Sequence, residues 1–182
     1  MGEVITESGM DFVADNTFYI EKSPLYTHIN GGVRSVEFVR AMEDKLLFVE
    51  AKTSFAKPDS EPSAEDRAAF RNEIDEICEK FIHSLNLYAS VEVGVADKAF
   101  PDGYNPPDKV SIAFILVIKN HERTWCKRIE TKLRQTLPAY LNRIWKPNVY
   151  VVNHETAKKQ RLIDFTSSPD RRRAAEAPTI YS

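Results

Sequence analysis

The sequence predicts an α/β protein in which a mixed β-sheet, with an N-terminal three-strand meander, is flanked by helices. Three short strand-like runs follow one another over residues 17–54, and two later strand-like runs alternate with helical stretches. That alternation is typical of a sheet covered by helices. A chain of 182 residues with 42% hydrophobic content can form one domain with a core. We therefore expect a single domain over residues 1–166, and a disordered tail at residues 167–182, which contain little to bury.

The meander is expected over residues 17–29, 33–42 and 45–54. Residues 30–32, with the sequence Asn-Gly-Gly, are a strong turn signal between its first two strands. Residues 43–45, with the sequence Glu-Asp-Lys, form a short polar turn before the third strand. The second and third strands are therefore expected to pair as a hairpin.

An amphipathic helix is expected to begin after Ser63. Asp66 takes the last position of a capping box, and apolar residues at helical spacing continue to Tyr88. Residues 90–95 are either a short strand or a continuation after this helix. Residues 97–109 are rich in Pro, Gly, Asn and Asp, which predicts a loop.

The rest of the sheet is expected from two apolar runs. Residues 110–118 are almost wholly apolar and β-branched, which predicts a central strand, and residues 149–152 predict the last strand. A second helix is expected between them over residues 122–145, with Pro138 marking a kink or a break.

Two acidic residues and a lysine lie where the second and third strands pair. Glu50 and Lys52 close the apolar run of residues 46–49, and Glu37 lies in the neighbouring strand. Side chains alternate along a strand, so Glu50 and Lys52 share a face on which Glu37 can meet them. Two carboxylates and an ammonium can hold a divalent metal and activate water. The alternative is that Glu50 and Lys52 are only a solvated charge pair. The continuously apolar run before them, however, indicates a buried strand, and buried charges need partners.

These residues resemble the active site of the PD-(D/E)xK nuclease superfamily, the fold of many restriction and repair endonucleases. In that family an acidic residue on one strand is followed by a turn and an apolar strand that ends in Glu-x-Lys. The resemblance covers about residues 17–152 and implies a restriction-endonuclease-like core. It implies that Glu37 and Glu50 bind Mg²⁺ or Mn²⁺, with the backbone carbonyl of Ala51 as a further ligand. It also implies that Lys52 activates water, so that the protein is a metal-dependent endonuclease.

The chain departs from the family in two places. Glu37 stands where the usual residue is Asp, and residues 1–16 form no convincing first helix, so we expect loose order or a short edge element there. Both departures favour the alternative function, a catalytically inactive nuclease-fold protein that binds nucleic acid or acts as an assembly subunit. In the family a polar residue of the helix after Glu-x-Lys often reaches the site. Glu73 and Lys80 are the candidates here, and a solvated helix edge is the simpler interpretation of both.

Charge is divided unevenly along the chain. Residues 119–182 carry fourteen Lys or Arg against six Asp or Glu, whereas residues 1–118 carry eleven against twenty-one. A basic segment can meet a polyanion, and the expected partner is nucleic acid, DNA rather than RNA. We expect six of its residues to contact phosphates: Lys127, Arg128, Lys132, Lys158, Lys159 and Arg161. The alternative is a bipolar surface without a ligand. For the nuclease that the resemblance implies, we also expect a homodimer or a complex with a targeting subunit.

The cysteines and the hydropathy indicate the compartment. Cys78 and Cys126 fall on apolar helical faces, and neither they nor the histidines have the spacing of a zinc site. No apolar run reaches the length of a membrane span. We therefore expect a cytoplasmic protein with free thiols.

Overall fold

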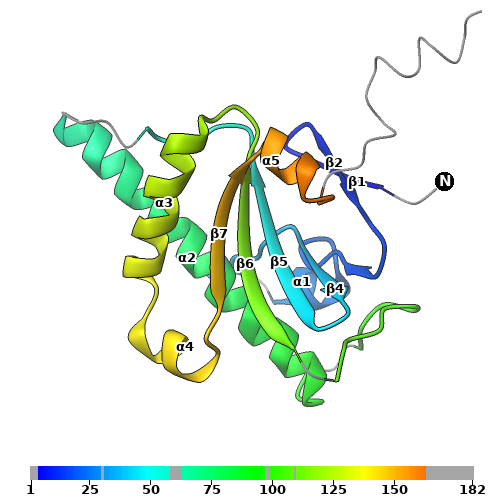
Figure 1. Ribbon diagram of the computed structural model, residues 1–182. Helices are drawn as coiled ribbons and strands as arrows, with labels where there is room; N and C mark the ends of the chain where they lie inside the picture. Colours follow the sequence, from blue (N-terminus) through cyan, green and yellow to red (C-terminus); the bar gives the residue numbers. More distant parts are fainter. Residues whose placement is uncertain (1–3, 30, 58–62, 97–98, 109, 163–182) are drawn as a thin grey trace, which may run out of the picture.

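A five-stranded mixed sheet organises the computed structural model (Figure 1). The structure describes residues 4–29, 31–57, 63–96, 99–108 and 110–162. In spatial order the strands are β3 (Thr17–Phe18), β4 (Phe38–Met42), β5 (Lys45–Lys52), β6 (Ser111–Ile118) and β7 (Asn148–Asn153). The first three pair antiparallel, whereas β6 is parallel to β5 and β7 is parallel to β6. The predicted α/β class, with a mixed sheet flanked by helices, is confirmed.

The longest helix, α2 (Ala64–Glu92), lies across one face of this sheet (Figure 1). It begins with the predicted capping box, since Oγ of Ser63 accepts the N–H of Asp66 (3.0 Å) and Oδ2 of Asp66 accepts the N–H of Ser63 (3.1 Å). Residues 90–92 belong to the helix, so the chain continues after Tyr88 as a helix and not as a strand. Residues 99–108 form a loop, as expected.

The beginning of the predicted meander is wrong in detail. The strand expected over residues 17–29 is limited to β3, and helix α1 (Pro24–His28) follows it. Ser23 caps this helix by accepting the N–H of Tyr26 on its Oγ (3.2 Å). A proline in the first turn suits a helix start because its missing N–H would have no partner there.

The second strand is shorter than predicted because the segment before it bonds to α2. The N–H of Arg34 donates to Nδ1 of His83 (3.1 Å). The N–H of Val36 donates to Oγ of Ser84, which is fully buried (2.8 Å). These backbone groups are therefore not available to a neighbouring strand, and β4 begins only after Glu37.

The N-terminal residues form a hairpin of their own, where the sequence predicted loose order or a short edge element. Strands β1 (Val4–Glu7) and β2 (Met10–Val13) pair antiparallel, with Gly9 in the turn at φ 68°. The hairpin packs on the sheet face opposite α2, where the rings of Phe12 and Phe38 meet edge to face at 5.3 Å. The hairpin is therefore part of the domain's second core layer.

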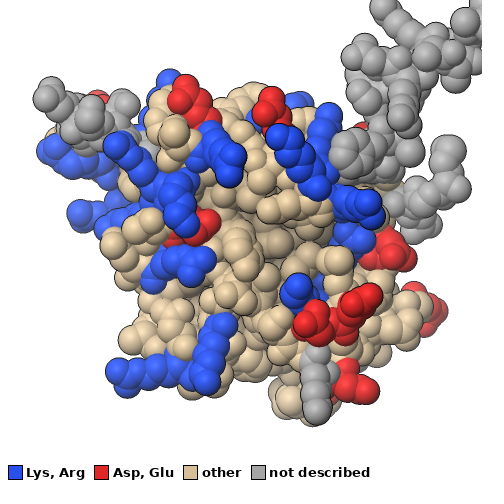
Figure 2. Space-filling view, in the orientation of Figure 1, with Lys and Arg blue, Asp and Glu red and all other residues tan. Residues whose placement is uncertain are grey.

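The predicted second helix is divided at Pro138 into α3 (Arg123–Thr136) and α4 (Ala139–Ile144). Helix α3 packs on the α2 side of the sheet, and α5 (His154–Lys159) lies on the other side, next to the hairpin (Figure 1). Lys and Arg side chains gather over α3 and around α5 on the face shown in Figure 2. On this face the basic side chains of the C-terminal part of the chain therefore gather over α3 and α5.

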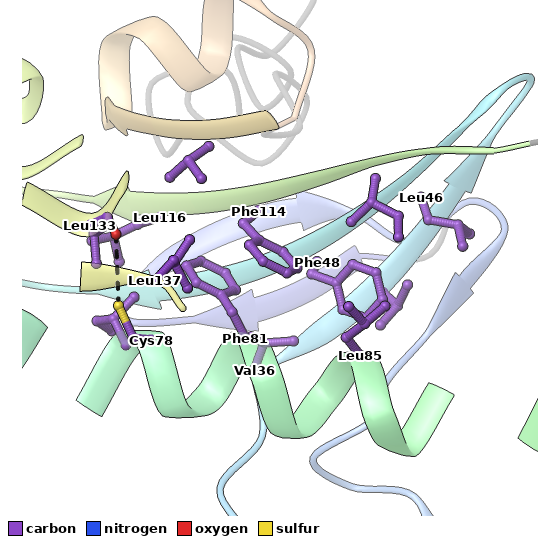
Figure 3. Packing of buried hydrophobic residues seen from close by; sticks show 14 of the residues in the cluster. Val36, Leu46, Phe48, Cys78, Phe81, Leu85, Phe114, Leu116, Leu133 and Leu137 are labelled. Carbon is purple, nitrogen blue, oxygen red and sulfur yellow. Dashed lines mark hydrogen bonds between the residues drawn. The ribbon is translucent and has the colours of Figure 1, made fainter. Parts of the chain in front are cut away.

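The alternation of side chains along β5 divides the core into two layers. Leu46 and Phe48 face α2, whereas Leu47, Val49 and Ala51 face the hairpin and α5. In the first layer the rings of Phe81 and Phe114 stack at 4.6 Å (Figure 3). By the same alternation Glu50 and Lys52 belong to the α2 face.

Side chains of α3 cover the outer edge of β7. Nη2 of Arg134 donates to the carbonyl of Val149 (2.5 Å), and the N–H of Val151 donates to Oε2 of Glu130 (3.4 Å). Strand edges with free backbone groups invite pairing with another chain, so this cover blocks part of the edge.

Two expectations concern the whole chain. The tail expected at residues 167–182, and the last residues of the domain expected over residues 1–166, lie outside the described residues. Within the described residues, no helix combines the length and apolar character needed to cross a bilayer.

Candidate active site at the end of strand β5

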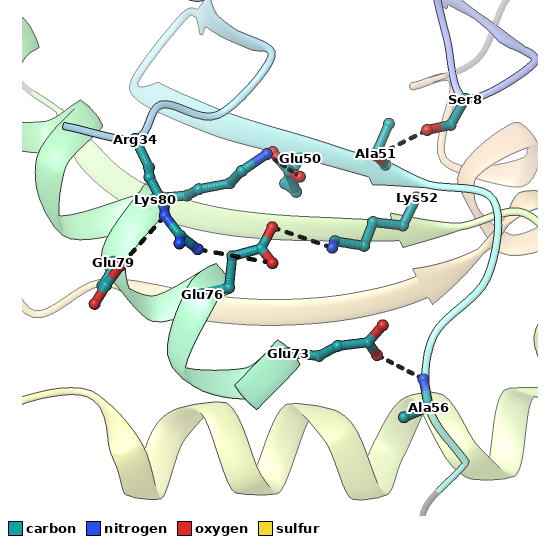
Figure 4. A network of polar contacts seen from close by, with 10 residues as sticks. All are labelled: Ser8, Arg34, Glu50, Ala51, Lys52, Ala56, Glu73, Glu76, Glu79 and Lys80. Atoms are coloured by element: carbon teal, nitrogen blue, oxygen red, sulfur yellow. Dashed lines mark hydrogen bonds and ion pairs between the residues drawn. The ribbon is translucent and has the colours of Figure 1, made fainter. Parts of the chain in front are cut away.

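Glu50 is a buried carboxylate near the carboxyl end of β5. Its side chain is 1% exposed, and Oε1 accepts a hydrogen bond from Nζ of Lys80 on α2 at 2.6 Å (Figure 4). Its other oxygen, Oε2, is buried and has no hydrogen-bond partner within the described part of the chain. Burial raises the pKa of Glu50 to about 7, although Lys80 acts in the opposite direction. One oxygen of Glu50 is therefore left for a further cation or a proton.

Glu37 stands directly before β4 and is 8% exposed. Its N–H donates to the carbonyl of Val49 on β5 (3.1 Å), which holds it against the strand of Glu50. Oε2 of Glu37 is also buried without a hydrogen-bond partner among the residues that the structure describes. Burial, a hydrogen bond with Glu21 and the charges of Glu50, Glu21 and Glu7 raise the pKa of Glu37 to about 9. The charges of three further carboxyl groups therefore act on Glu37.

Glu7 and Glu21 were not part of the predicted site. One carboxylate oxygen from each of Glu7, Glu21 and Glu37 lies within 4.8 Å of the others. Glu7 ends β1 and pairs with Nζ of Lys22 (3.0 Å), whereas Glu21 follows β3 and donates its N–H to the carbonyl of Glu37 (3.4 Å). No local sequence pattern marks either residue, because the docking of the N-terminal hairpin brings Glu7 to the cluster.

Lys52 lies on the same face of β5 as Glu50, as predicted. Its Nζ is 3.2 Å from Oε1 of Glu76 on α2, and Nη1 of Arg34 lies 3.7 Å from the other oxygen of Glu76 (Figure 4). The charge of Lys52 still acts on Glu50 and lowers the pKa of that carboxyl. The ammonium is therefore near the buried carboxylates but holds a different partner.

The backbone carbonyl of Ala51, the third predicted metal ligand, points toward the hairpin. It accepts a hydrogen bond from Oγ of Ser8 (2.9 Å), the residue that follows Glu7 (Figure 4). A carbonyl oxygen has two lone pairs, so one remains for another partner. The hairpin thus places both a hydroxyl and a carboxylate beside the end of β5.

Of the two helix residues considered from the sequence, Lys80 reaches the site and Glu73 does not. Burial lowers the pKa of Lys80, but the charge and hydrogen bond of Glu50 and the charges of Glu37 and Glu21 together outweigh it, so the pKa of Lys80 lies above its ordinary value. Oε2 of Glu73 instead accepts the N–H of Ala56 (2.6 Å) and anchors the segment after β5 (Figure 4).

The six predicted phosphate contacts fall into two groups on opposite sheet faces. Three of them lie on α3, which packs on the α2 side, and the others lie in or just after α5, on the hairpin side. The first group is Lys127, Arg128 and Lys132, and the second is Lys158, Lys159 and Arg161. Both helices follow the carboxyl end of a parallel strand, which is also the edge that carries Glu50 and where ligands of open α/β sheets bind.

The donor set fits a divalent cation. Carboxylate and carbonyl oxygens are the ligands that Mg²⁺ and Mn²⁺ prefer. Glu37 and Glu50 each have a buried oxygen that no described donor satisfies, and Glu7 and Glu21 add further carboxylates close by. The two buried carboxylates, Glu37 and Glu50, need protons or cations to balance their charge.

Comparisons with protein-family models, with curated proteins and with solved structures found no match for this chain. We therefore infer its function from the geometry of the site.

Proposed function

We propose that the protein is a metal-dependent nuclease that hydrolyses phosphodiester bonds, with a site of the PD-(D/E)xK type. The observation that carries this proposal is the pair of buried carboxylates, Glu50 on β5 and Glu37 directly before β4. Each has an oxygen without a hydrogen-bond partner among the described residues, and the N–H of Glu37 donates to the carbonyl of Val49 on β5. The order of elements from β3 through α2 and β6 to β7 is the order expected for a restriction-endonuclease-like core, which supports the proposal further.

Glu37 and Glu50 would hold Mg²⁺ or Mn²⁺, with Glu7, Glu21 and the Ala51 carbonyl as further oxygen donors. When bound, such an ion supplies Lewis-acid chemistry that polarises a phosphate and acidifies a water. The protein excludes solvent around the two buried carboxylates, and this strengthens their attraction for a cation.

The two lysines would have different tasks. Lys80 holds Oε1 of Glu50 at 2.6 Å and thus fixes the direction of the remaining oxygen. Lys52 is bound to Glu76 at 3.2 Å and is 20% exposed, so its ammonium can turn to an incoming phosphate or water. An ammonium in that place neutralises charge that develops on the phosphate during hydrolysis.

The proposed substrate is DNA in preference to RNA, bound through the basic residues of α3 and α5. The proposed compartment is the cytoplasm, because Cys78 and Cys126 are free thiols buried in the core. The domain would act as a homodimer or with a targeting subunit.

One observation favours a second candidate, a catalytically inactive protein that binds nucleic acid or serves in an assembly. Lys80 and Lys52 both have carboxylate partners within the protein, at 2.6 Å and 3.2 Å, as a structural ion-pair network would have.

A cleavage assay with single- and double-stranded DNA and with RNA, in Mg²⁺ or Mn²⁺, tests the proposal. Wild-type protein should cleave, and Lys52→Ala should lower the rate at least about 100-fold while the protein stays folded. Lys45→Ala, at the exposed start of the same strand, is the matched control. Wild-type protein that binds no divalent metal by calorimetry and cleaves no substrate would favour the second candidate.

A further inference from the structure

A basic groove runs between α2 and α3, on the same sheet face as Glu50. Its volume is about 320 Å³. One aromatic residue of α2 and five polar or basic residues of α3 line it: Phe70, Lys127, Arg128, Thr131, Lys132 and Gln135. The five residues of α3 are spaced at helical intervals and form its exposed face.

The groove has the charge that suits a polyanion. Three of its lining residues are cations, and no carboxylate is among those lining residues. Lys127 contacts Glu130 at 2.7 Å, yet its side chain is 75% exposed and can still meet a second partner. Arg67 and Arg71 lie within one helical turn of Phe70 on α2 and are exposed.

Phe70 adds an aromatic ring, which is not required for contacts with phosphates. Its ring is half-buried and meets the ring of Phe55 edge to face at 6.1 Å, so it is fixed in place within the groove. Aromatic rings in positively charged grooves stack the bases of single-stranded nucleic acids, whatever the base. A duplex keeps its bases stacked inside, where a ring in a groove between two helices does not reach them.

The groove also lies close to the candidate site. Phe55, which contacts Phe70, is three residues after Lys52, and three residues of extended chain span at most about 11 Å. Beyond it, Nζ of Lys57 lies over the ring of Trp125 on α3 at 4.9 Å. The segment that leaves β5 therefore joins the site to the groove.

We propose that the α2–α3 groove binds a single-stranded segment of nucleic acid, with a base stacked on Phe70 and phosphates on Lys127, Arg128 and Lys132. This inference rests on the proposed function for its ligand class and adds the form of the substrate. A free single strand, or the single-stranded part of a branched duplex, would then lead to Glu50.

Fluorescence anisotropy in the presence of a chelator tests binding without cleavage. The probes are a labelled single-stranded DNA, a duplex of the same length and an abasic strand with the same phosphates. Wild-type protein should bind the single strand most tightly. Phe70→Leu should weaken that binding about tenfold and leave the abasic strand unaffected, whereas Phe70→Tyr, which keeps a ring, should bind like wild type.

A second pair of variants tests the groove without touching the core. Thr131→Glu places a negative charge among the cations and should weaken single-strand binding about tenfold. Asn142→Glu adds the same charge on α4, outside the groove, and should change binding less than about twofold. Equal binding of duplex and single strand, or equal effects of the two glutamates, would overturn the proposal. If the protein binds single strands but does not cleave them in Mg²⁺, the proposal for the groove stands and only the proposed nuclease activity is rejected.

Discussion

Lys80 and Glu50, thirty residues apart in the chain, form the shortest ion pair among the described residues, at 2.6 Å. Glu50 is almost wholly buried, so Lys80 is the main compensation for its charge. The two side chains come from the sheet and from the helix that covers it, which makes the pair a link between two layers of the fold.

Replacing Lys80 with Met is therefore expected to destabilise the protein in a pH-dependent way. A buried carboxylate without its partner costs about 3–5 kcal/mol of unfolding free energy while it stays charged, and less where it is protonated. Chemical denaturation should show a larger loss above pH 7 than below it, and Lys80→Met combined with Glu50→Gln should recover most of the loss. Lys45→Met is the exposed control, and a loss independent of pH would contradict this explanation.

The raised pKa values of Glu37 and Glu50 predict how stability depends on pH without metal. Both carboxyls hold protons in the folded protein at pH values where the unfolded chain has released them, so unfolding releases protons. The free energy of unfolding in a chelator should therefore fall as the pH rises from about 5 to about 9, by at most about 1.4 kcal/mol per pH unit for each group. Glu37→Gln should flatten this slope, and a slope of the opposite sign would contradict the shifts.

Metal ions should reverse that trend. Carboxylates must lose their protons to bind a cation, so stabilisation by Mn²⁺ should grow with pH. Calorimetric titration should show the weakest binding for Glu37→Gln, and Glu7→Gln should weaken it several-fold because a nearby charge is lost. Glu43→Gln, on the exposed turn between β4 and β5, should bind like wild type. Equal affinities of the Glu7 and Glu43 variants for Mn²⁺ would show that the N-terminal hairpin does not contribute to metal binding.

Ser84→Ala tests the anchoring of the segment before Glu37. The substitution leaves the buried N–H of Val36 without its acceptor, which should cost about 1–3 kcal/mol of unfolding free energy. Ser111→Ala, at an exposed position, should cost less than about 0.5 kcal/mol. Urea denaturation measures the free energy of unfolding. A similar decrease in the two variants would show that the hydrogen bond to Val36 contributes little to stability.

The basic residues of α5 predict a dependence of nucleic-acid binding on salt. Each phosphate contact releases counterions, so the joint change Lys158→Ala and Lys159→Ala should reduce the slope of log affinity against log salt by about 1 to 2. The loss should be similar for different sequences, as expected of phosphate contacts. If the affinity changes neither with salt nor with this double substitution, the positive charge of α5 serves another role.

Local sequence patterns were sufficient for some elements and failed for others. The capping box at Ser63, the apolar run of β6 and the break at Pro138 depend on neighbouring residues, and all three are present. The strand expected over residues 17–29 is wrong because Ser23 and Pro24 form a helix start, a signal that the strand-like composition concealed.

The same distinction applies to the site. Glu50 and Lys52 share a face because strand periodicity is local, and their contacts with α2 agree with it. Glu21 and Glu7 meet Glu37 only through long-range packing of the hairpin and the segment before α1, which no spacing in the sequence encodes. The pairing of Lys52 with Glu76 is equally a product of how α2 lies on the sheet.

Because β5 pairs with β6, we expect the candidate site to be complete only after β6 has been synthesised. All of its acidic and basic groups lie within the first part of the chain: Glu7, Glu21, Glu37, Glu50, Lys52 and Lys80. Yet β5 pairs along its full length with β6, Ser111–Ile118, which the ribosome makes later. We therefore expect the burial of Glu50, and the desolvation that strengthens cation binding, to be complete only after β6 has joined the sheet. If the protein is the nuclease proposed above, it can become active only after β6 has been made.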